Sequence, residues 1–309
     1  MRRRRLGSQG PEISVVGFGA WEAGGTAWGP NASDDSVIDA MRSGLDAGVD
    51  WIDTAEVYGD GVSEGLVGKA VVGRRDDVTI ASKVAPSPEG SGFRPDQVHA
   101  ACEGSLERLG TDRIDVYQLH WRDETGVPVE DTWGAMTELQ DAGKVRAIGV
   151  SNFDRESIEK CEAIRHVDSL QQEFSMLDRR HADLVRWCGE HGVGVVSYGP
   201  LAYGLLTGAI SKDTTFEEGD WRGRAESEGD DGPFGDLAGS LSTVERLRPV
   251  AERLGCTSAQ LALAWNVAQP GVTAAIAGSR SADHTRSNAD AGDLELDDAT
   301  LEELNAILG

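Results

Sequence analysis

Four side chains that can donate a proton or carry a charge lie at or just after apolar segments of the chain: Asp53, Tyr58, Lys83 and His120. A tyrosine has an unperturbed pKa of about 10, so it donates a proton near neutral pH only where its phenolate is stabilised. Lys83 can supply a positive charge for that purpose, and Asp53 can keep the ammonium charged and oriented. His120 is a further group that can donate or accept a hydrogen bond. These residue types together indicate general-acid chemistry.

Each of these residues also has a structural interpretation when it is considered alone. An aspartate at a strand end commonly caps a turn, and a single histidine is commonly a hydrogen-bonded structural group. Lys83 is more informative, because the chain has only five lysines against 24 arginines and this one lies in an apolar segment that disfavours a charge. The combination of the four residues therefore carries the prediction.

The chain also has a repeating pattern that can bring these residues together. Segments rich in Val and Ile alternate with helical patterns, which is typical of βα units around a parallel sheet. Strands are predicted at residues 15–19, 49–53, 78–83, 114–121, 145–151, 169–172, 193–198 and 273–277. Helices are predicted at residues 34–47, 63–71, 95–109, 129–142, 155–165, 179–190, 241–254, 258–267 and 282–289, with a final helix at 298–307. This order predicts an α/β protein that forms a single (β/α)8 TIM barrel domain over residues 1–309, with a C-terminal helix.

A TIM barrel places its active site at the C-terminal ends of the strands. Asp53, Lys83 and His120 lie at the ends of the second, third and fourth predicted strands, and Tyr58 lies in the loop after the second. A long irregular segment at 211–240, rich in Gly, Asp and Glu, follows the seventh strand and is predicted to form a lid at the same face. Disordered filler is the alternative interpretation of that segment.

On these strands the four residues resemble the catalytic tetrad of the aldo-keto reductases. Residues 53–64 and 143–153 are similar to two signature stretches of that family, and the Gly-Leu-Leu-Thr-Gly sequence at 204–208 is similar to its cofactor-loop motif. The resemblance runs from about residue 4 to residue 288 and is closest to the bacterial stress-type and channel-β-subunit-like branch. It implies reduction of an aldehyde or ketone, with hydride from a nicotinamide cofactor, a proton from Tyr58 and no metal.

The resemblance also implies which residues bind the cofactor, expected to be NADPH with NADH as the alternative. The nicotinamide would be held by Ser151, Asn152 and Gln171 and stacked on Tyr198. The pyrophosphate would approach Gly199, Leu201 and Gly204, and the adenosine 2′-phosphate and adenine would meet Gly278, Ser279, Arg280, His284 and Asn288. The chain departs from the family at two of these places, with His284 where many members have Gln or Arg and Ser287 where many have Glu.

The same mapping places Trp21, Trp28 and Trp121 in loops at the mouth of the barrel, which predicts an aromatic pocket for a small carbonyl or sugar substrate. Burial of these rings in the core is the alternative. Arg122 and Arg222 are candidate anchors for the substrate. The sequence leaves the substrate, the direction of the reaction and the oligomeric state open.

Composition limits the partners and the compartment. The formal net charge is −24, which argues against nucleic acid and anionic lipid surfaces. No apolar stretch approaches the roughly 18 residues of a membrane-spanning helix, and four cysteines without a Cys-x-x-Cys pair fit reduced thiols, so a soluble cytoplasmic protein is expected. The arginine run at residues 2–5 resembles an export signal, but the polar segment after it favours a surface strand.

Two other functional classes remain open. Some barrels of this family serve as cofactor-bound regulatory subunits of membrane channels, although no apolar docking segment stands out in this chain. A barrel lyase or aldolase would instead use Lys83 as a Schiff base.

The acidic surface and the shortage of lysine also indicate a salt-adapted, halophilic protein, with an acidic mesophilic protein as the alternative. The Debye length falls to about 3 Å at 1 M salt, so mutual repulsion within a surface of net charge −24 is screened there and not in dilute buffer. We expect the melting temperature and the activity to rise from dilute buffer into molar KCl. Equal melting temperatures in about 0.1 M and 2 M salt would contradict the halophilic interpretation.

Overall fold

The computed structural model describes residues 1–309 apart from 26–27, 29–31 and 224–231. In the described part of the chain, eight parallel strands form a closed barrel in which β10 pairs with β3. These strands are β3 (Val16–Gly19), β4 (Trp51–Asp53), β5 (Thr79–Val84), β6 (Ile114–Leu119), β7 (Val145–Ser151), β8 (Ser169–Glu173), β9 (Gly194–Tyr198) and β10 (Val272–Gly278). The predicted TIM barrel is confirmed.

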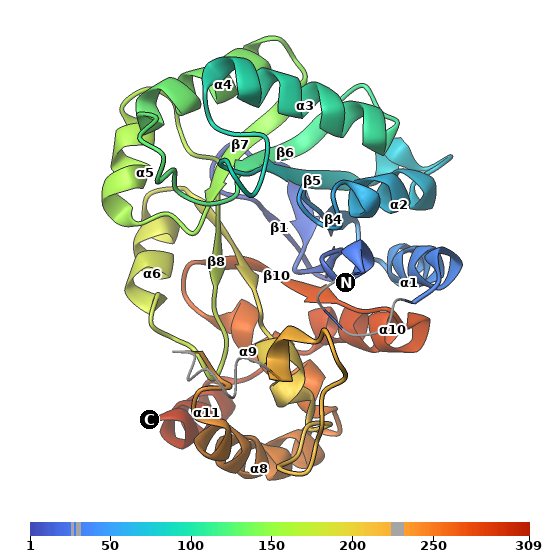
Figure 1. Cartoon of the computed structure of the whole chain (residues 1–309). Coiled ribbons are helices and arrows are strands. Elements are labelled where there is room, and N and C mark those ends of the chain that lie inside the picture. The colour runs from blue at the N-terminus through green and yellow to red at the C-terminus, as the bar shows by residue number, and fades with distance from the viewer. Residues whose placement is uncertain (26–27, 29–31, 224–231) are drawn as a thin grey trace.

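The helices surround the strands as an outer layer (Figure 1). They are α1 (Asp34–Asp46), α2 (Val62–Ala70), α3 (Pro95–Leu109), α4 (Val129–Asp141), α5 (Arg155–Glu162), α6 (Ala182–Glu190), α8 (Leu237–Leu254), α9 (Ser258–Ala268), α10 (Ala282–Asp290) and α11 (Asp298–Leu308). Short 3-10 turns lie at η1 (Glu22–Gly24), η2 (Arg75–Asp77), η3 (Ala202–Thr207) and η4 (Ala291–Asp293). In α1 the buried positions Val37, Ala40, Met41 and Leu45 recur every three or four residues, so one face packs against the barrel.

An N-terminal hairpin covers the interior of the barrel at the end opposite the catalytic face. Its strands are β1 (Arg3–Arg5) and β2 (Glu12–Ser14), and its apolar side chains pack in one cluster with Trp51. Trp51 lies so close to Gly17 that a Cβ at that position would be 2.0 Å from the indole ring, which explains the glycine. Arg4 donates hydrogen bonds to the carbonyls of Val267 and Val272, so the arginine run is a structural strand, as predicted.

The structure differs from the prediction at several element ends. The strand predicted to reach residue 121 ends at Leu119, and the two residues after it, His120 and Trp121, stack their rings on each other. Helix α6 begins at Ala182 and not at 179, because a turn closed by the pairing of Arg180 with Asp178 precedes it.

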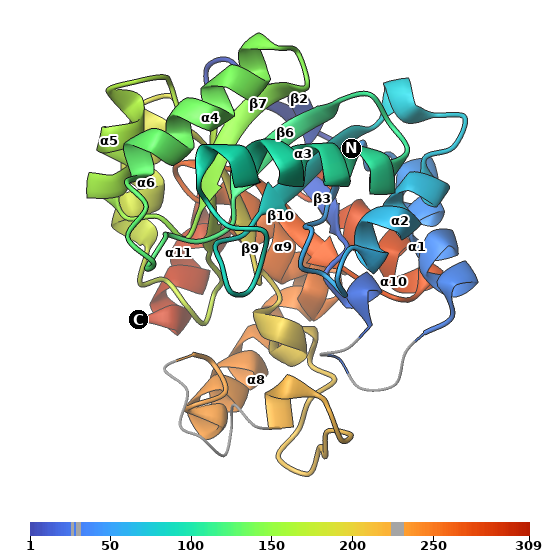
Figure 2. The ribbon, with the colours of Figure 1, turned by 45° about the horizontal axis from the view of Figure 1, so that its top comes forward.

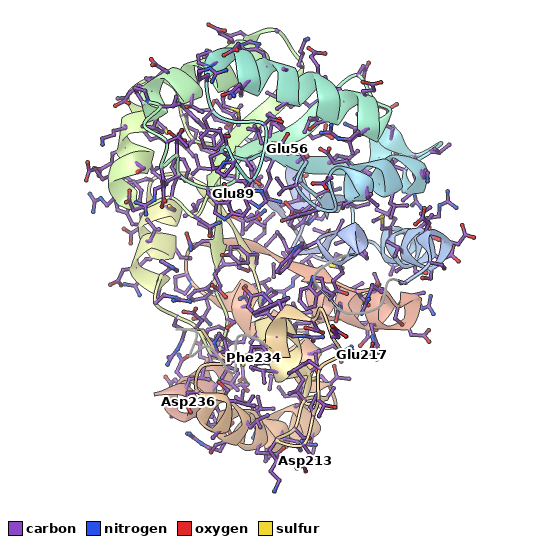
Figure 3. All side chains as sticks on the ribbon, in the orientation of Figure 1. Glu56, Glu89, Asp213, Glu217, Phe234 and Asp236 are labelled. Carbon is purple, nitrogen blue, oxygen red and sulfur yellow. The ribbon has the colours of Figure 1, made fainter. Side chains whose placement is uncertain are left out.

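The segment after β9 contains the predicted lid at 211–240, of which residues 224–231 lie outside the described residues. It begins with η3, and α8 starts at Leu237, four residues earlier than predicted, with the Asp236 side chain accepting from the Gly239 amide. In Figure 2 the yellow and orange part of the chain projects beyond the barrel beside α8. Figure 3 places Asp213, Glu217, Phe234 and Asp236 there, apart from Glu56 and Glu89. Phe234 contacts Phe216 and Trp221, so an aromatic core joins the two ends of the segment.

Three of the four cysteines are buried, and burial keeps their thiols protonated. Cys102, Cys161 and Cys188 are buried free thiols, and burial raises the pKa of Cys102 to about 11 and the pKa of the other two to about 12. Within the described ranges, no helix combines the length and the apolar character needed to cross a membrane.

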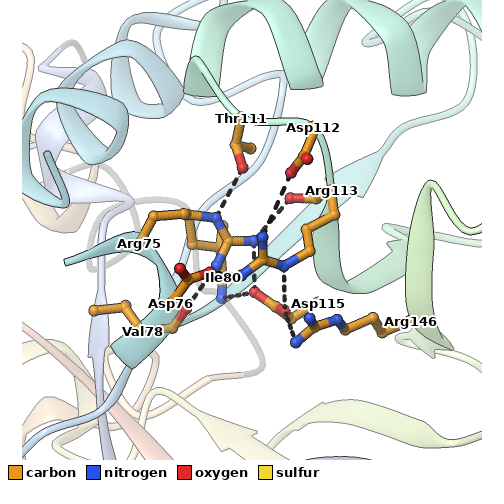
Figure 4. Close-up of polar contacts among 9 residues, drawn as sticks. All are labelled: Arg75, Asp76, Val78, Ile80, Thr111, Asp112, Arg113, Asp115 and Arg146. Atoms are coloured by element: carbon orange, nitrogen blue, oxygen red, sulfur yellow. Dashed lines mark hydrogen bonds and ion pairs between the residues drawn. The ribbon is translucent and has the colours of Figure 1, made fainter. Parts of the chain in front are cut away.

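A cluster of arginines holds the beginnings of three neighbouring strands together (Figure 4). Its centre is Asp115, a buried residue at the start of β6 that accepts a hydrogen bond from the amide of Ile80 at 2.9 Å. The carboxylate is 2.8 Å from Arg75 Nη2, 3.1 Å from Arg146 Nη1 and 3.8 Å from Arg113 Nε. One buried negative charge therefore connects β5, β6 and β7.

We expect Asp115→Asn to lower the free energy of unfolding by about 3 kcal/mol, because it removes the charge that compensates partly buried arginines while keeping the side-chain shape. Urea denaturation followed by circular dichroism measures this change. The matched control is Asp112→Asn, which removes an 89% exposed carboxylate paired with Arg113 in the same cluster and should leave the free energy of unfolding nearly unchanged. Equal effects of the two substitutions would contradict the central role of Asp115.

Candidate active site

Lys83 contacts two of the other three predicted tetrad residues, Asp53 and Tyr58. Its ammonium Nζ is 2.6 Å from Asp53 Oδ1, 2.8 Å from the carbonyl oxygen of Thr54 and 3.3 Å from the hydroxyl oxygen of Tyr58. Lys83 is completely buried and Asp53 nearly so. The ammonium therefore has three oxygen partners, which compensate its removal from water.

Pairing of β4 with β5 sets this geometry. Asp53 is the last residue of β4 and is in register with Ala81, and side chains of a strand alternate between its two faces, so Lys83 projects on the same side as Ala81. The loop that carries Tyr58 is fixed at its base, where the Ser63 hydroxyl donates to the Ala20 carbonyl. Adjacent strand ends thus deliver the carboxylate and the ammonium, and a tethered loop delivers the phenol.

The sequence predicts a stabilised phenolate at Tyr58, but the pKa of this phenol shifts in the opposite direction. Burial and, second, the charge of Asp53 raise the pKa of the phenol well above its usual value. Burial also lowers the pKa of Lys83, although Asp53 opposes that shift. The pKa of the phenol is therefore raised and not lowered, because burial disfavours its charged form. The phenol is protonated at neutral pH, as a proton donor must be.

His120 completes the group from the next strand. Its ring lies 5.5 Å from the Tyr58 ring, centroid to centroid, and stacks parallel on Trp121 at 3.9 Å. Burial, with a smaller contribution from Lys83, lowers the pKa of His120 well below its usual value, so the imidazole is neutral. No group of the described residues hydrogen-bonds its buried Nδ1 atom. Stacking therefore orients a neutral ring that retains hydrogen-bonding capacity.

The residues expected to hold the nicotinamide form a network with one another and with the tetrad. Gln171 Nε2 donates to Asp53 Oδ2 at 2.7 Å and lies 3.3 Å from Gln118 Oε1. Asn152, with a positive φ of 59°, donates to the oxygens of His120 and Ser151. Its own Oδ1 accepts from the hydroxyl of Tyr198 at 2.8 Å.

Sequence reasoning missed Gln118 in this network. Gln118 is buried in β6, two residues before His120, and donates to the hydroxyl of Ser169 at 3.1 Å. A polar residue that shares a strand face with a candidate catalytic residue was the available signal.

A cleft of about 680 Å³ lies beside these residues, between the end of β3 and the loops after β9 and β10. The predicted residues that line it are Trp21, Trp28, Gly199, Leu201, Gly204, Gly278, Ser279, Arg280, His284 and Asn288. Asn152 and Tyr198 line a neighbouring cavity of about 610 Å³. Small residues, an arginine and the N-terminus of α10 suit a ligand that carries phosphate groups, so the cleft fits a dinucleotide. Glu22 and Arg222 also line this cleft, and the acidic Glu22 was not among the predicted residues.

Aromatic rings close the cleft toward the tetrad. Trp21 lies 5.0 Å from Trp28, 6.4 Å from Tyr58 and 6.2 Å from Trp221, measured between ring centroids. The Arg222 guanidinium lies 5.0 Å from the centroid of the Trp28 ring. These rings form a largely apolar wall beside the phenol.

The two candidate substrate anchors are both ion-paired. Arg222 pairs with Asp220 at 2.5 Å, and Arg122 pairs with Asp154 at 2.5 Å. Trp121 lies against His120 and does not line the cleft, so the three predicted pocket tryptophans are divided between the wall and the histidine.

The amino-acid sequence of this chain matches a known protein family and its members. The model of the aldo/keto reductase family matches residues 15–308. Aldo-keto reductase YhdN of Bacillus subtilis (strain 168) is 34% identical over 315 aligned positions, which cover 100% of this chain and 94% of the relative.

Solved structures agree with this match. The glycerol dehydrogenase AKR11B4 from Gluconobacter oxydans has a TM-score of 0.86 at 29% identity, covering 99% of this chain and 94% of that chain. An aldo-keto reductase from Klebsiella pneumoniae in complex with NADPH has a TM-score of 0.76 at 32% identity, covering 100% of this chain and 96% of that chain. The matched region contains all eight barrel strands and all four tetrad candidates, so this chain belongs to the aldo/keto reductase family of oxidoreductases.

Proposed function

We propose that this protein reduces a small aldehyde or ketone to the alcohol with NADPH, and that Tyr58 donates the proton. The observation that carries the proposal is the contact of the buried Lys83 ammonium with both Asp53 and the Tyr58 hydroxyl. The complex of the Klebsiella pneumoniae relative with NADPH supports the choice of cofactor.

In this proposal the side chains of the protein orient the carbonyl group and donate one proton to its oxygen. A bound nicotinamide cofactor supplies the hydride. The Tyr58 phenol donates its proton to the carbonyl oxygen, and Lys83 stabilises the phenolate that remains, because its ammonium lies 3.3 Å from that oxygen. His120 orients the carbonyl oxygen, and the ring of Trp21 excludes water on the cleft side.

For the cofactor, the proposal assigns the adenosine 2′-phosphate to Arg280 and Ser279 and the nicotinamide to the Asn152 and Gln171 network. Ser279 and Arg280 follow β10 directly and precede the capping residue Ser281 of α10, whose free backbone amides favour an anion. Arg280 Nη2 lies 3.2 Å from the carbonyl oxygen of Trp28, so its guanidinium already reaches across the cleft.

Oxidation of an alcohol is the second candidate, favoured by the likeness to a glycerol dehydrogenase. The same site would run in reverse, with the Tyr58 phenolate accepting the proton of the alcohol. Burial raises the pKa of Tyr58, so little phenolate is present at neutral pH to accept that proton.

Three further parts of the proposal concern context. The protein belongs to the bacterial stress-type and channel-β-subunit-like branch of the family, acts in the cytoplasm as a single-domain barrel, and is adapted to salt. The net charge of −24 supports the last point, and the sequence resemblance supports the first.

We expect Tyr58→Phe to lower the reduction rate by at least about 10²-fold while leaving the dissociation constant of NADPH nearly unchanged, because only the proton donor is removed. The reduction rate is measured as consumption of NADPH or NADH with a panel of carbonyl compounds in high salt. Fluorescence titration measures the dissociation constant of NADPH. The matched control is Tyr117→Phe. Tyr117 lies on the face of β6 opposite to that of Gln118 and is buried in the hydrophobic core, so loss of its hydroxyl should leave the reduction rate unchanged. A Tyr58→Phe enzyme within a few-fold of the unmodified protein would remove Tyr58 from the mechanism.

We expect Arg280→Met to weaken NADPH binding by about 10- to 150-fold and to leave NADH binding almost unchanged, since a hydrogen bond to a charged group is worth roughly 1.5–3 kcal/mol. Titration of both cofactors checks this expectation. Arg286→Met on α10 is the control, because that arginine pairs with Asp283 on the surface. Equal losses for NADPH and NADH would show that Arg280 supports the fold or the adenine instead.

A further inference from the structure

One acidic side chain, Glu22, faces the basic wall of the cofactor cleft. Glu22 begins η1, directly after the first barrel strand and Trp21, and its side chain is 24% exposed. Its Oε2 atom is 3.7 Å from Arg280 Nε. A carboxylate therefore lies beside the arginine to which the proposed function assigns a phosphate.

Several charged groups face this carboxylate from different elements. Burial, as the largest influence, raises the pKa of Glu22 above its usual value and the nearby Asp220 adds to this rise, whereas Arg280 after β10, Arg222 after β9 and His284 on α10 oppose it. Of the basic groups, Arg280 is in direct contact with the carboxylate, and Arg222 is itself paired with Asp220.

The carboxylate of Glu22 is also in close contact with the backbone at the end of β10, where the proposed function places the adenosine 2′-phosphate. A Cβ at Gly278 would be 3.3 Å from Glu22 Oε1, so the side chain covers the end of β10. Arg280 contacts Glu22 and the carbonyl of Trp28 together, and both partners follow β3. These contacts connect the two walls of the cleft through a single arginine.

We propose that Glu22 competes with the 2′-phosphate of the cofactor for Arg280, and that it thereby weakens NADPH binding and reduces the preference for NADPH over NADH. This inference rests on the proposed function. The Glu22 carboxylate, with Oε2 3.7 Å from Arg280 Nε, offsets part of the positive charge of the guanidinium and would repel a 2′-phosphate bound to the same group. NADH lacks the 2′-phosphate and leaves the pair of Glu22 and Arg280 intact.

The test is the substitution Glu22→Gln, which removes the charge and keeps the shape. Fluorescence titration should show NADPH binding tightened by about 5- to 30-fold, the range expected for one removed like charge at a partly exposed site, with a much smaller change for NADH. Asp283→Asn is the control for general electrostatics, because it removes an equal charge from the first turn of α10 where the carboxylate pairs with Arg286. That control should change NADPH binding far less.

Two further measurements test whether the effect of Glu22 depends on the 2′-phosphate of the cofactor and on Arg280. Adenosine 2′-monophosphate should bind more tightly to Glu22→Gln, whereas adenosine 5′-monophosphate should bind equally to both proteins. In the Arg280→Met background the added Glu22→Gln substitution should no longer tighten NADPH, because the two side chains act on each other.

The outcomes separate this inference from the proposed function. Unchanged NADPH binding in Glu22→Gln, with an unmodified protein that binds NADPH, overturns the competition alone. Equal tightening of NADPH and NADH overturns it as well, since the carboxylate would then oppose the pyrophosphate. If the unmodified protein binds neither dinucleotide, the proposed function fails and the inference fails with it.

Discussion

The ion pair between Lys83 and Asp53 inside the barrel mouth is the interaction on which the rest of the site depends. Burying two charges costs several kcal/mol for each ion unless close partners compensate them. Here the ammonium has three oxygen partners, and the carboxylate also accepts from Gln171. Removing either charge would leave the other buried without compensation, so the pair constrains β4, β5 and β8 together. The phenol of Tyr58 then meets an ammonium whose position is already determined.

The closed barrel supplies the rigidity that this pair needs. Parallel pairing of β4, β5 and β6 places residues from three strands at one rim, although they are distant in sequence. At the opposite end, the N-terminal hairpin and Trp51 fill the interior, and the buried Asp115 connects the strand beginnings. Structural charges therefore lie at one end of the strands and the reactive ones at the other, as TIM barrels arrange them.

The cleft brings basic side chains together in a strongly acidic protein. The negative charges spread over the surface, whereas Arg280, Arg222 and His284 come together at one place in the cleft. Close contacts between charges act within a few ångströms, where surface screening has little effect, so local geometry determines binding there. Among the described residues that line this cleft, Glu22 is the acidic one, and its carboxylate lies 3.7 Å from Arg280.

The sequence alone determined the barrel and the family, because alternating strand and helix patterns and the motifs around Asp53, Lys83 and Asn152 are local features. It also indicated that Tyr58, Lys83 and Asp53 act together. The ends of β6 and α6 differ from the prediction beside two contacts between near neighbours in the chain, Trp121 with His120 and Arg180 with Asp178, which the strand and helix patterns do not reveal. The direction of the Tyr58 pKa shift and the position of Glu22 beside Arg280 needed the tertiary structure. Desolvation and contacts between residues more than 250 positions apart arise only when the barrel closes, and no local pattern encodes them.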